Sequence, residues 1–312
     1  GRAVNGSLRN LNLYEYQNYY YMQDATKPMR GYINTFTANN SYTGNAYFVA
    51  GNTSNINDPA AVSAHSYAEV VYDFYKNMFN RDSIDDNGMT INSIVHFGSN
   101  YNNAYWDGYK MVYGDGDGRT FTSLSGDLDV VAHEMTHGVT SYTCDLNYEN
   151  QSGALNETLS DVFGVLIQTY DKYNVKNGGY WEFNPSDWVV GDEIYTPGVQ
   201  GDALRSLANP TLYNQPAHMN NYINLPNTKD GDYGGVHINS GITNKAAYNL
   251  ASYVGCEKTA KIFYRAMTTY FNNTTSFAEA KLGLIKSAKD LYGNNSREAQ
   301  AVDTAFTSVG IY

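Results

Sequence analysis

The sequence has few cysteines, few basic residues and no long apolar stretch, and each shortage excludes a class of protein. Neither of its 2 cysteines has a C-x-x-C partner, so a zinc site built on cysteines is excluded. Only 20 Lys and Arg stand against 31 Asp and Glu, without basic clusters, which argues against a nucleic-acid partner because phosphates need clustered cations. No stretch approaches the roughly 18 apolar residues of a membrane span, so we expect no membrane partner.

The remaining composition is that of a globular protein. A length of 312 residues fits two domains of roughly 150 residues each. With 42% hydrophobic and 16% charged residues, the chain can bury a core, which a disordered chain cannot. It starts at Gly1 without methionine and has no basic-then-apolar leader, so we expect the mature form of an exported protein.

One stretch concentrates side chains that bind metals. His133 and His137 are four residues apart, which places both imidazoles on one face of a helix, one turn apart. Glu134 lies about 100° round that helix from His133, beside an ion that both rings could share. The pattern H-E-x-x-H is typical of zinc proteases, in which the glutamate is a general base and not a ligand. The alternative is a buried helix whose histidines bond to backbone carbonyls.

A second helix offers a third ligand. Catalytic zinc takes three protein ligands and keeps one position for water. Apolar residues recur at helical spacing after Gly153, while Glu157 and Asp161 share another face of the same helix. A helical hairpin could bring Glu157 to the ion. Asp161 could accept the free N–H of a ligand histidine, and Asn156 could do similar work as an amide. The alternative for Glu157 is a solvated helix residue.

Periodicity predicts strands early in the chain and helices late. Alternation in 32–37, 46–49 and 91–97 predicts strands, and apolar spacing after Asp58 predicts one helix between them. Residues 171–235 lack a long periodic run, and such a long loop region is usually functional. Helices are predicted over 242–253, 259–270, 277–291 and 297–306.

The glycine-rich segment 113–118 resembles a calcium loop but fails the EF-hand pattern, which favours a tight turn. We interpret His65, His96 and His218 as structural.

Several segments together resemble the thermolysin family of secreted zinc endopeptidases. The segments that carry this resemblance are 102–106, 111–118, 133–137, 156–161, 195–198 with 202–205, and 232–241. They run in order from about residue 58 to the C-terminus, whereas the residues before 58 match only loosely. The resemblance implies one catalytic zinc ion with His133, His137 and Glu157 as its ligands. It also implies that Glu134 activates the zinc-bound water.

The resemblance assigns further residues to the reaction. His237 and Tyr148 correspond to the groups that stabilise the tetrahedral oxyanion, and Asp232 to the residue that orients His237. Zinc lowers the pKa of its water toward about 7 and polarises the scissile carbonyl. Donors aimed at a developing oxyanion contribute about 3 kcal/mol each in comparable sites. These roles together describe metal-assisted hydrolysis of a peptide bond.

The resemblance also implies where a peptide would bind. Asn103, Ala104 and Trp106 correspond to the edge that holds the substrate main chain. An apolar pocket for the residue after the scissile bond would have Arg205 at its base and be lined by Phe121, Leu124, Val130, Val190, Ile194 and Leu204. From this lining we expect a preference for a bulky hydrophobic residue after the cleaved bond.

Calcium is expected on the same grounds. One set corresponds to calcium ligands beside the active site, namely Asp129, Asp187, Asp192 and the Val189 carbonyl. Gln168 stands where the family commonly has a glutamate, and this loss of charge argues for one ion there rather than two. A second set matches a single-ion loop and comprises Tyr195, Thr196, Val199 and Asp202. We therefore expect one or two structural calcium ions. The alternative is that these acids are solvated loop charges.

The sequence thus predicts an α+β protein that is a secreted zinc metalloendopeptidase. We expect a β-rich N-terminal domain over 1–145 that ends in the zinc-binding helix. A mainly α-helical domain over 146–312 would carry the third ligand and the oxyanion histidine, with the active-site cleft and the zinc helix between the domains. We expect a monomer that acts on proteins or peptides, in its mature form after removal of a leader and pro-segment. The rival interpretations are a zinc aminopeptidase, for which no acidic cluster is evident, and a catalytically silent zinc-stabilised binding module.

Overall fold

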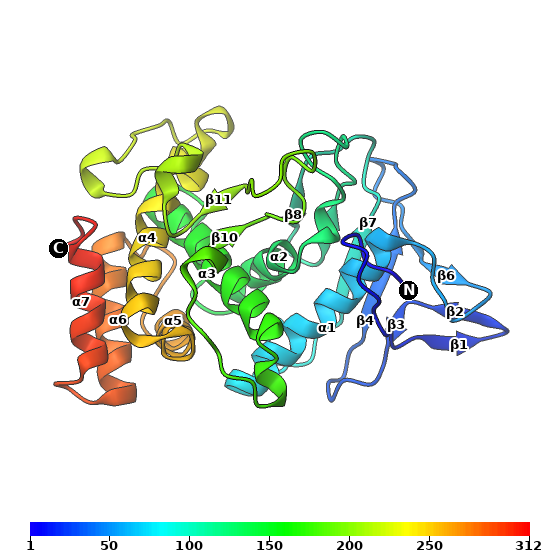
Figure 1. Ribbon diagram of the computed structural model, residues 1–312, viewed down its shortest axis with the longest axis horizontal. Coiled ribbons are helices and arrows are strands. Elements are labelled where there is room, and N and C mark those ends of the chain that lie inside the picture. The colour runs from blue at the N-terminus through cyan, green and yellow to red at the C-terminus, as the bar shows by residue number, and fades with distance from the viewer. The chain divides into compact units, whose positions relative to one another are not determined.

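The computed structural model describes residues 1–312 and divides them into two compact units. The first unit comprises Gly1–Val139 and Gly191–Leu204, and the second comprises Thr140–Val190 and Arg205–Tyr312. The first unit combines the main sheet with two long helices, and the second is mainly helical (Figure 1). This confirms the predicted α+β class, with a β-rich N-terminal and a helical C-terminal region. The domain boundary at 145/146 stays a prediction.

The first unit is built on a mixed sheet. The order of its strands is β3–β4–β7–β9–β8, with β5 paired to β4 outside this path. β4 is parallel to β7 and β7 to β9, whereas β8 runs antiparallel to β9 and forms the sheet edge. A separate ribbon has the order β1–β2–β6. The strands of this unit are β1 (Tyr14–Tyr16), β2 (Tyr19–Tyr21), β3 (Gln23–Asp24), β4 (Ile33–Thr37), β5 (Tyr47–Phe48), β6 (Ala50–Gly51), β7 (Ile91–Val95), β8 (Ala104–Trp106) and β9 (Met111–Tyr113).

Two helices of the first region cover that sheet. α1 (Pro59–Phe79) begins where the Asp58 side chain accepts the Ala61 N–H, and it ends at Asn80 in the left-handed conformation. α2 (Leu128–Ser141) carries the H-E-x-x-H pattern. Met135 and Val139 of α2 line one small internal pocket together with Ile91 of β7. Met135 is 2% exposed, so we expect its truncation to alanine to lower the free energy of unfolding by about 2–5 kcal/mol.

The second unit is a helical assembly around α3 (Asn150–Lys172) and α4 (Asp232–Val254), which pack against each other. α5 (Cys256–Thr269), α6 (Phe277–Tyr292) and α7 (Arg297–Thr307) follow the predicted helices closely. Ser276 and Glu279 form a capping box that fixes the start of α6. A two-stranded pair, β10 (Val189–Val190) and β11 (Arg205–Ser206), completes the regular structure.

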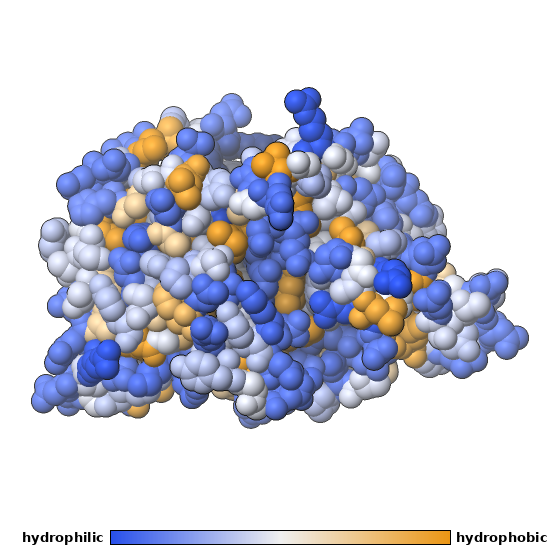
Figure 2. All heavy atoms as spheres, in the orientation of Figure 1, coloured by the Kyte–Doolittle hydropathy of each residue, from blue (hydrophilic) through white to orange (hydrophobic).

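The long segment without periodicity is folded into short 3₁₀ helices and turns, several of which begin at a capping side chain. These are η2 (Val175–Asn177), η3 (Pro185–Asp187), η4 (Pro210–Tyr213), η5 (Met219–Asn221) and η6 (Lys229–Gly231), besides η1 (Leu124–Gly126) earlier in the chain. The face shown in Figure 2 is mostly hydrophilic, with apolar atoms scattered among polar ones. No helix has the length and apolar character that crossing a membrane requires. Cys144 and Cys256 are both free and buried.

Candidate functional site

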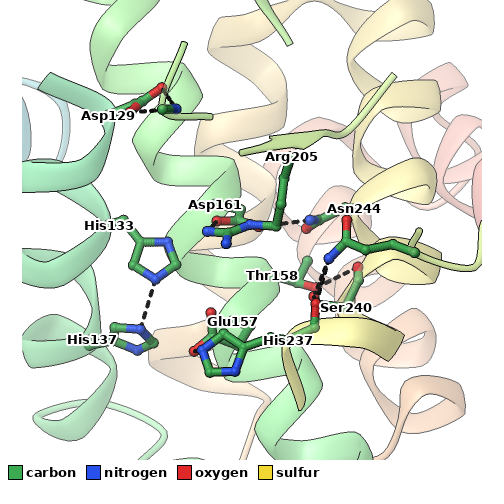
Figure 3. A network of polar contacts seen from close by, with 12 residues as sticks. Asp129, His133, His137, Glu157, Thr158, Asp161, Arg205, His237, Ser240 and Asn244 are labelled. Atoms are coloured by element: carbon green, nitrogen blue, oxygen red, sulfur yellow. Dashed lines mark hydrogen bonds and ion pairs between the residues drawn. The ribbon is translucent and has the colours of Figure 1, made fainter. Parts of the chain in front are cut away.

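The histidine pair lies on α2, in the first unit. His133 and His137 are one turn apart, and their Nε2 atoms lie 3.0 Å from each other. The two ring planes stand at 83°, with centroids 4.7 Å apart, so both nitrogens point to one place (Figure 3). Two imidazole nitrogens that converge in this way suit a zinc ion, which binds neutral histidine. The spacing therefore produces the geometry that the sequence predicts.

The neighbouring Glu134 is held close to the sheet. Glu134 is buried, with only 7% of its surface exposed. It lies one turn before Gly138, and a Cβ added at Gly138 would come within 3.3 Å of the Trp106 ring of β8. α2 therefore packs on the edge strand at this level, which fixes the backbone that carries Glu134.

Glu157, Tyr148 and His237 meet in the second unit. The Tyr148 hydroxyl donates to Glu157 Oε1 and lies 3.1 Å from His237 Nε2. His237 Nε2 is 3.4 Å from the same Glu157 oxygen. Glu157 itself is buried, with 1% of its surface exposed. The sequence assigned one carboxylate and two polar groups to the reaction from three distant segments, and these three side chains lie together.

Asp232, to which the resemblance assigns an orienting role, contacts His237 at two atoms. Its carboxylate accepts the His237 backbone N–H at 2.8 Å and lies 2.6 Å from His237 Nδ1. The Nδ1 proton is thereby directed to Asp232, which leaves Nε2 facing Glu157 and Tyr148. The Glu157 charge, and then Asp232, hold the pKa of His237 above its ordinary value although burial acts in the other direction. A raised pKa favours the protonated imidazolium, the form that can donate to an oxyanion.

Asp161 has partners that the sequence did not assign to it. It is fully buried, and it accepts Arg205 Nε at 2.9 Å and Nη2 at 2.7 Å (Figure 3). Asn244 Nδ2 donates to it at 2.9 Å. Asn156 donates its amide to the Leu146 carbonyl at 3.2 Å. The expected roles of Asp161 and Asn156 beside a ligand histidine, and of Arg205 at the base of a pocket, stay predictions.

Three carboxylates gather near the start of α2, in the first unit. Asp127, Asp129 and Asp192 each offer an oxygen, and these atoms lie within 4.8 Å of one another. Burial raises the pKa of Asp127 to about 7, with Asp192 and Glu193 adding to the shift. Burial likewise raises the pKa of Asp129, and the neighbouring acids add to it. A divalent cation with oxygen ligands would suit such a cluster.

Of these three carboxylates, the sequence predicted Asp129 and Asp192 as calcium ligands but missed Asp127. The available signal was the Asp-Leu-Asp start of the zinc helix, where the helix dipole favours acids. Asp187 belongs to the second unit, where Lys172 Nζ at 2.7 Å and the Tyr173 hydroxyl at 2.8 Å donate to it. Val189 pairs with Ser206 in the β10–β11 ladder. Both stay predicted ligands, as does the reduced charge at Gln168.

The second predicted calcium set folds as one tight turn in the first unit. Thr196 has a φ of 40°, and its hydroxyl donates to Asp202 Oδ2 at 2.7 Å. The Val199 N–H donates to the Thr196 carbonyl at 2.7 Å. Tyr195 directly precedes this turn and forms a bridge with Phe121. The turn thus brings the predicted ligands close together in sequence and in space.

The predicted substrate residues are spread over both units. Ala104 and Trp106 belong to the edge strand β8, and Asn103 directly precedes it and accepts the Gly114 N–H through its carbonyl at 3.0 Å. The pocket residues in the first unit are Phe121, Leu124, Val130, Ile194 and Leu204, whereas Val190 lies in the second. Leu124, Val130 and Ile194 are buried, at 4%, 7% and 0% exposure. A pocket shared by these side chains stays a prediction.

The chain matches two sequence models of one class of protein, the metallopeptidases. Residues 1–141 match the catalytic domain of thermolysin metallopeptidase, and residues 144–311 match its alpha-helical domain. Together these matches cover nearly the whole chain. The chain belongs to the thermolysin metallopeptidase family.

Named relatives support this membership. The whole chain is 47% identical to a bacillolysin of Bacillus cereus over 324 residues, which is 54% of that protein. It is 45% identical to the neutral protease NprE of Bacillus pumilus, of which it covers 98%. Several other curated relatives are likewise matched over only a little more than half of their length, as for a thermolysin at 57%. A solved precursor of protealysin, a metalloproteinase from Serratia proteamaculans, is 34% identical with a TM-score of 0.79, covering 92% of this chain and 90% of that one.

Proposed function

We propose that this chain is a zinc endopeptidase that hydrolyses peptide bonds in proteins. The observation that carries the proposal is the convergence of the His133 and His137 Nε2 atoms beside the buried Glu134. With Glu157 they supply two imidazoles and a carboxylate, a donor set that suits catalytic zinc. Membership of a metallopeptidase family supports the same assignment.

The roles of the chain's own groups follow from their chemistry. Zinc, when bound, supplies Lewis acidity toward water and the scissile carbonyl. Glu134 accepts the proton of the attacking water and delivers it to the leaving amine, as a general acid–base. His237 and Tyr148 donate hydrogen bonds to the carbonyl oxygen as negative charge develops on it. Asp232 keeps His237 in the orientation and protonation state for that task.

Further parts of the proposal concern substrate and location. We infer that a bulky hydrophobic side chain is preferred after the scissile bond, because the predicted pocket is lined by apolar residues. A cleavage map on a peptide library tests this, and a preference for charged residues at that position would refute it.

We also infer secretion, removal of a leader and pro-segment, a monomeric state, and one or two structural calcium ions. N-terminal sequencing of the protein from culture medium tests the processing.

The central experiment compares the parent chain with Glu134→Gln, which keeps the size of the side chain but removes the base. The parent should hold one zinc per chain and hydrolyse casein, and chelation should abolish hydrolysis until zinc is restored. Glu134→Gln should keep its zinc yet lose roughly 10²- to 10⁴-fold in rate. The matched control is Glu15→Gln, the same change at an exposed position of β1. A zinc-loaded Glu134→Gln variant with full activity would contradict the proposed role of Glu134.

A further inference from the structure

Two buried hydroxyl groups in the sheet of the first unit lack a full hydrogen bond. Ser93 on β7 is 0% exposed and Tyr113 on β9 is 1% exposed. Neither Ser93 Oγ nor the Tyr113 hydroxyl has a partner with full hydrogen-bond geometry, although the two hydroxyls are close enough for Ser93 to act against the rise in the Tyr113 pKa. A buried hydroxyl without a full hydrogen bond destabilises the folded chain. Alanine in place of Ser93, or phenylalanine in place of Tyr113, would avoid this cost. Packing alone therefore does not account for these hydroxyls.

The strand register places both hydroxyls on one face of the sheet. Ser93 pairs with Met111 across the parallel β7–β9 ladder. Tyr113 follows Met111 by two residues, so its side chain leaves the sheet on the same side. Trp106 pairs with Met111 across the antiparallel β8–β9 ladder and shares that face. Its indole nitrogen is also buried without a partner.

The same face of the sheet lies against α2 on the side of Glu134. Trp106 packs tightly against the Gly138 position, since a Cβ there would be only 3.3 Å from the ring. Residues four apart share one face of a helix, so Glu134 is on the face of α2 that meets the sheet. Burial raises the pKa of Tyr113 well above its ordinary value, and the Glu134 charge adds to this shift. The two side chains are therefore close enough to interact electrostatically.

We propose that Tyr113 is a positioning residue that holds the Glu134 carboxylate from the sheet side, with Ser93 supporting the Tyr113 hydroxyl. A phenol has one proton to donate, and a buried carboxylate is the strongest acceptor it can meet. Catalytic hydrogen bonds are often long in the free enzyme and tighten in the substrate complex. A fixed donor to one Glu134 oxygen leaves the other oxygen free to accept the proton of water. This inference rests on the proposed role of Glu134 as general base.

The test is Tyr113→Phe, measured on a defined peptide substrate with zinc content determined for every sample. We expect kcat to fall about tenfold while KM stays within about twofold, because the base is misplaced and substrate binding is not. The urea midpoint should stay equal or rise, since an unpaired buried hydroxyl has been removed. Ser93→Ala should lower kcat less, and adding it to Tyr113→Phe should lower kcat no further.

The matched control is Tyr292→Phe at the end of α6, whose hydroxyl is also buried without a partner. It should leave kcat unchanged. A readout independent of activity is the unfolding cycle of Tyr113→Phe with Glu134→Gln, which should be non-additive if the side chains interact.

The outcomes separate the two proposals. A zinc-loaded parent that cleaves no peptide would overturn the proposed function, and the role of Tyr113 with it. An active parent whose Tyr113→Phe variant keeps its kcat, or changes only KM, would overturn the role of Tyr113 alone.

Discussion

Two buried carboxylates, Asp161 in the second unit and Asp127 in the first, have different surroundings. Asp161 accepts hydrogen bonds from Nε and Nη2 of Arg205 and from the Asn244 amide. Its negative charge therefore faces a fixed cation. Asp127 accepts the Glu193 N–H at 2.9 Å and lies among Asp129 and Asp192. Its pKa rises to about 7, chiefly through burial. The Asp161 charge is balanced by Arg205, while Asp127 lies beside other acids, where a proton or an added cation would be stabilising.

The largest expected effect comes from breaking the balanced case. Arg205→Met should lower the free energy of unfolding by about 3–5 kcal/mol, because it leaves the Asp161 charge buried without its cation. Urea unfolding in the Glu134→Gln background measures this without autolysis. Asp161→Asn added to Arg205→Met should recover part of the loss. A loss below about 1 kcal/mol in the single variant would show that Asp161 does not depend on Arg205.

The next effect concerns calcium at the acidic cluster of Asp127, Asp129 and Asp192. Calcium at about 100 times its Kd should stabilise the parent by about 2.7 kcal/mol, and Asp127→Asn should remove most of this gain. Without calcium, Asp127→Asn should be at least as stable as the parent, because one buried charge has gone. Thermal unfolding with and without calcium, zinc being kept constant, measures both effects. Asp187→Asn tests the ligand that the sequence predicts in the other unit. A parent that calcium does not stabilise would contradict the site.

An intermediate case is His96, which lies between two acids in the first unit. Its Nδ1 is 2.7 Å from Asp115 and its Nε2 is 3.0 Å from Asp58. Hydrogen bonds to these carboxylates raise the pKa of His96 from 6.5 to about 10. The protonated form therefore stabilises the folded chain below pH about 6.5, and the gain is lost as pH rises to about 10. His96→Gln should remove roughly 1–2 kcal/mol at low pH and little at high pH. Urea unfolding across this range would contradict the assignment if parent and variant differed equally throughout.

The smallest effect is expected where both charges are solvated. Lys261 and Glu257 form an i,i+4 pair on α5 with 40% and 59% of their side chains exposed. Lys261→Ala should change the free energy of unfolding by less than about 0.5 kcal/mol, since water screens the pair. The same urea assay measures this change in the free energy of unfolding. A loss as large as that of Arg205→Met would show that burial does not explain the differences among these variants.

Local patterns predicted those parts of the site that depend on helical spacing. His133 and His137 converge because residues four apart share a helix face, and nothing distant is needed for that. The last three predicted helices appear with nearly the predicted bounds, because their apolar stripes and caps are local features, whereas α4 begins at Asp232, ten residues before the predicted start at 242. His65 is indeed a packed residue, bonded to Thr35 and to the Asn12 carbonyl.

Partners distant in the sequence were beyond such patterns. Asp161 meets Arg205 and Asn244 across 44 and 83 residues, a pairing that only the packing of α3 and α4 with β11 creates. Asp127 looked like an ordinary acid at a helix start, and only the return of 191–193 to it makes a cluster. Ser93 and Tyr113 could not be recognised either, because their lack of partners depends on how α2 covers the sheet.

The non-helical backbone at the start of α4 has a consequence for protein engineering. Asp232, Tyr233, Gly234 and Gly235 all have positive φ, from 50° to 87°. A Cβ at Gly234 would lie 2.3 Å from Asn150 Oδ1, and one at Gly235 would lie 2.8 Å from Asn239 Nδ2. Directed evolution toward new specificity should therefore leave these four positions out of its libraries, since variants there would misplace His237 before changing any substrate contact.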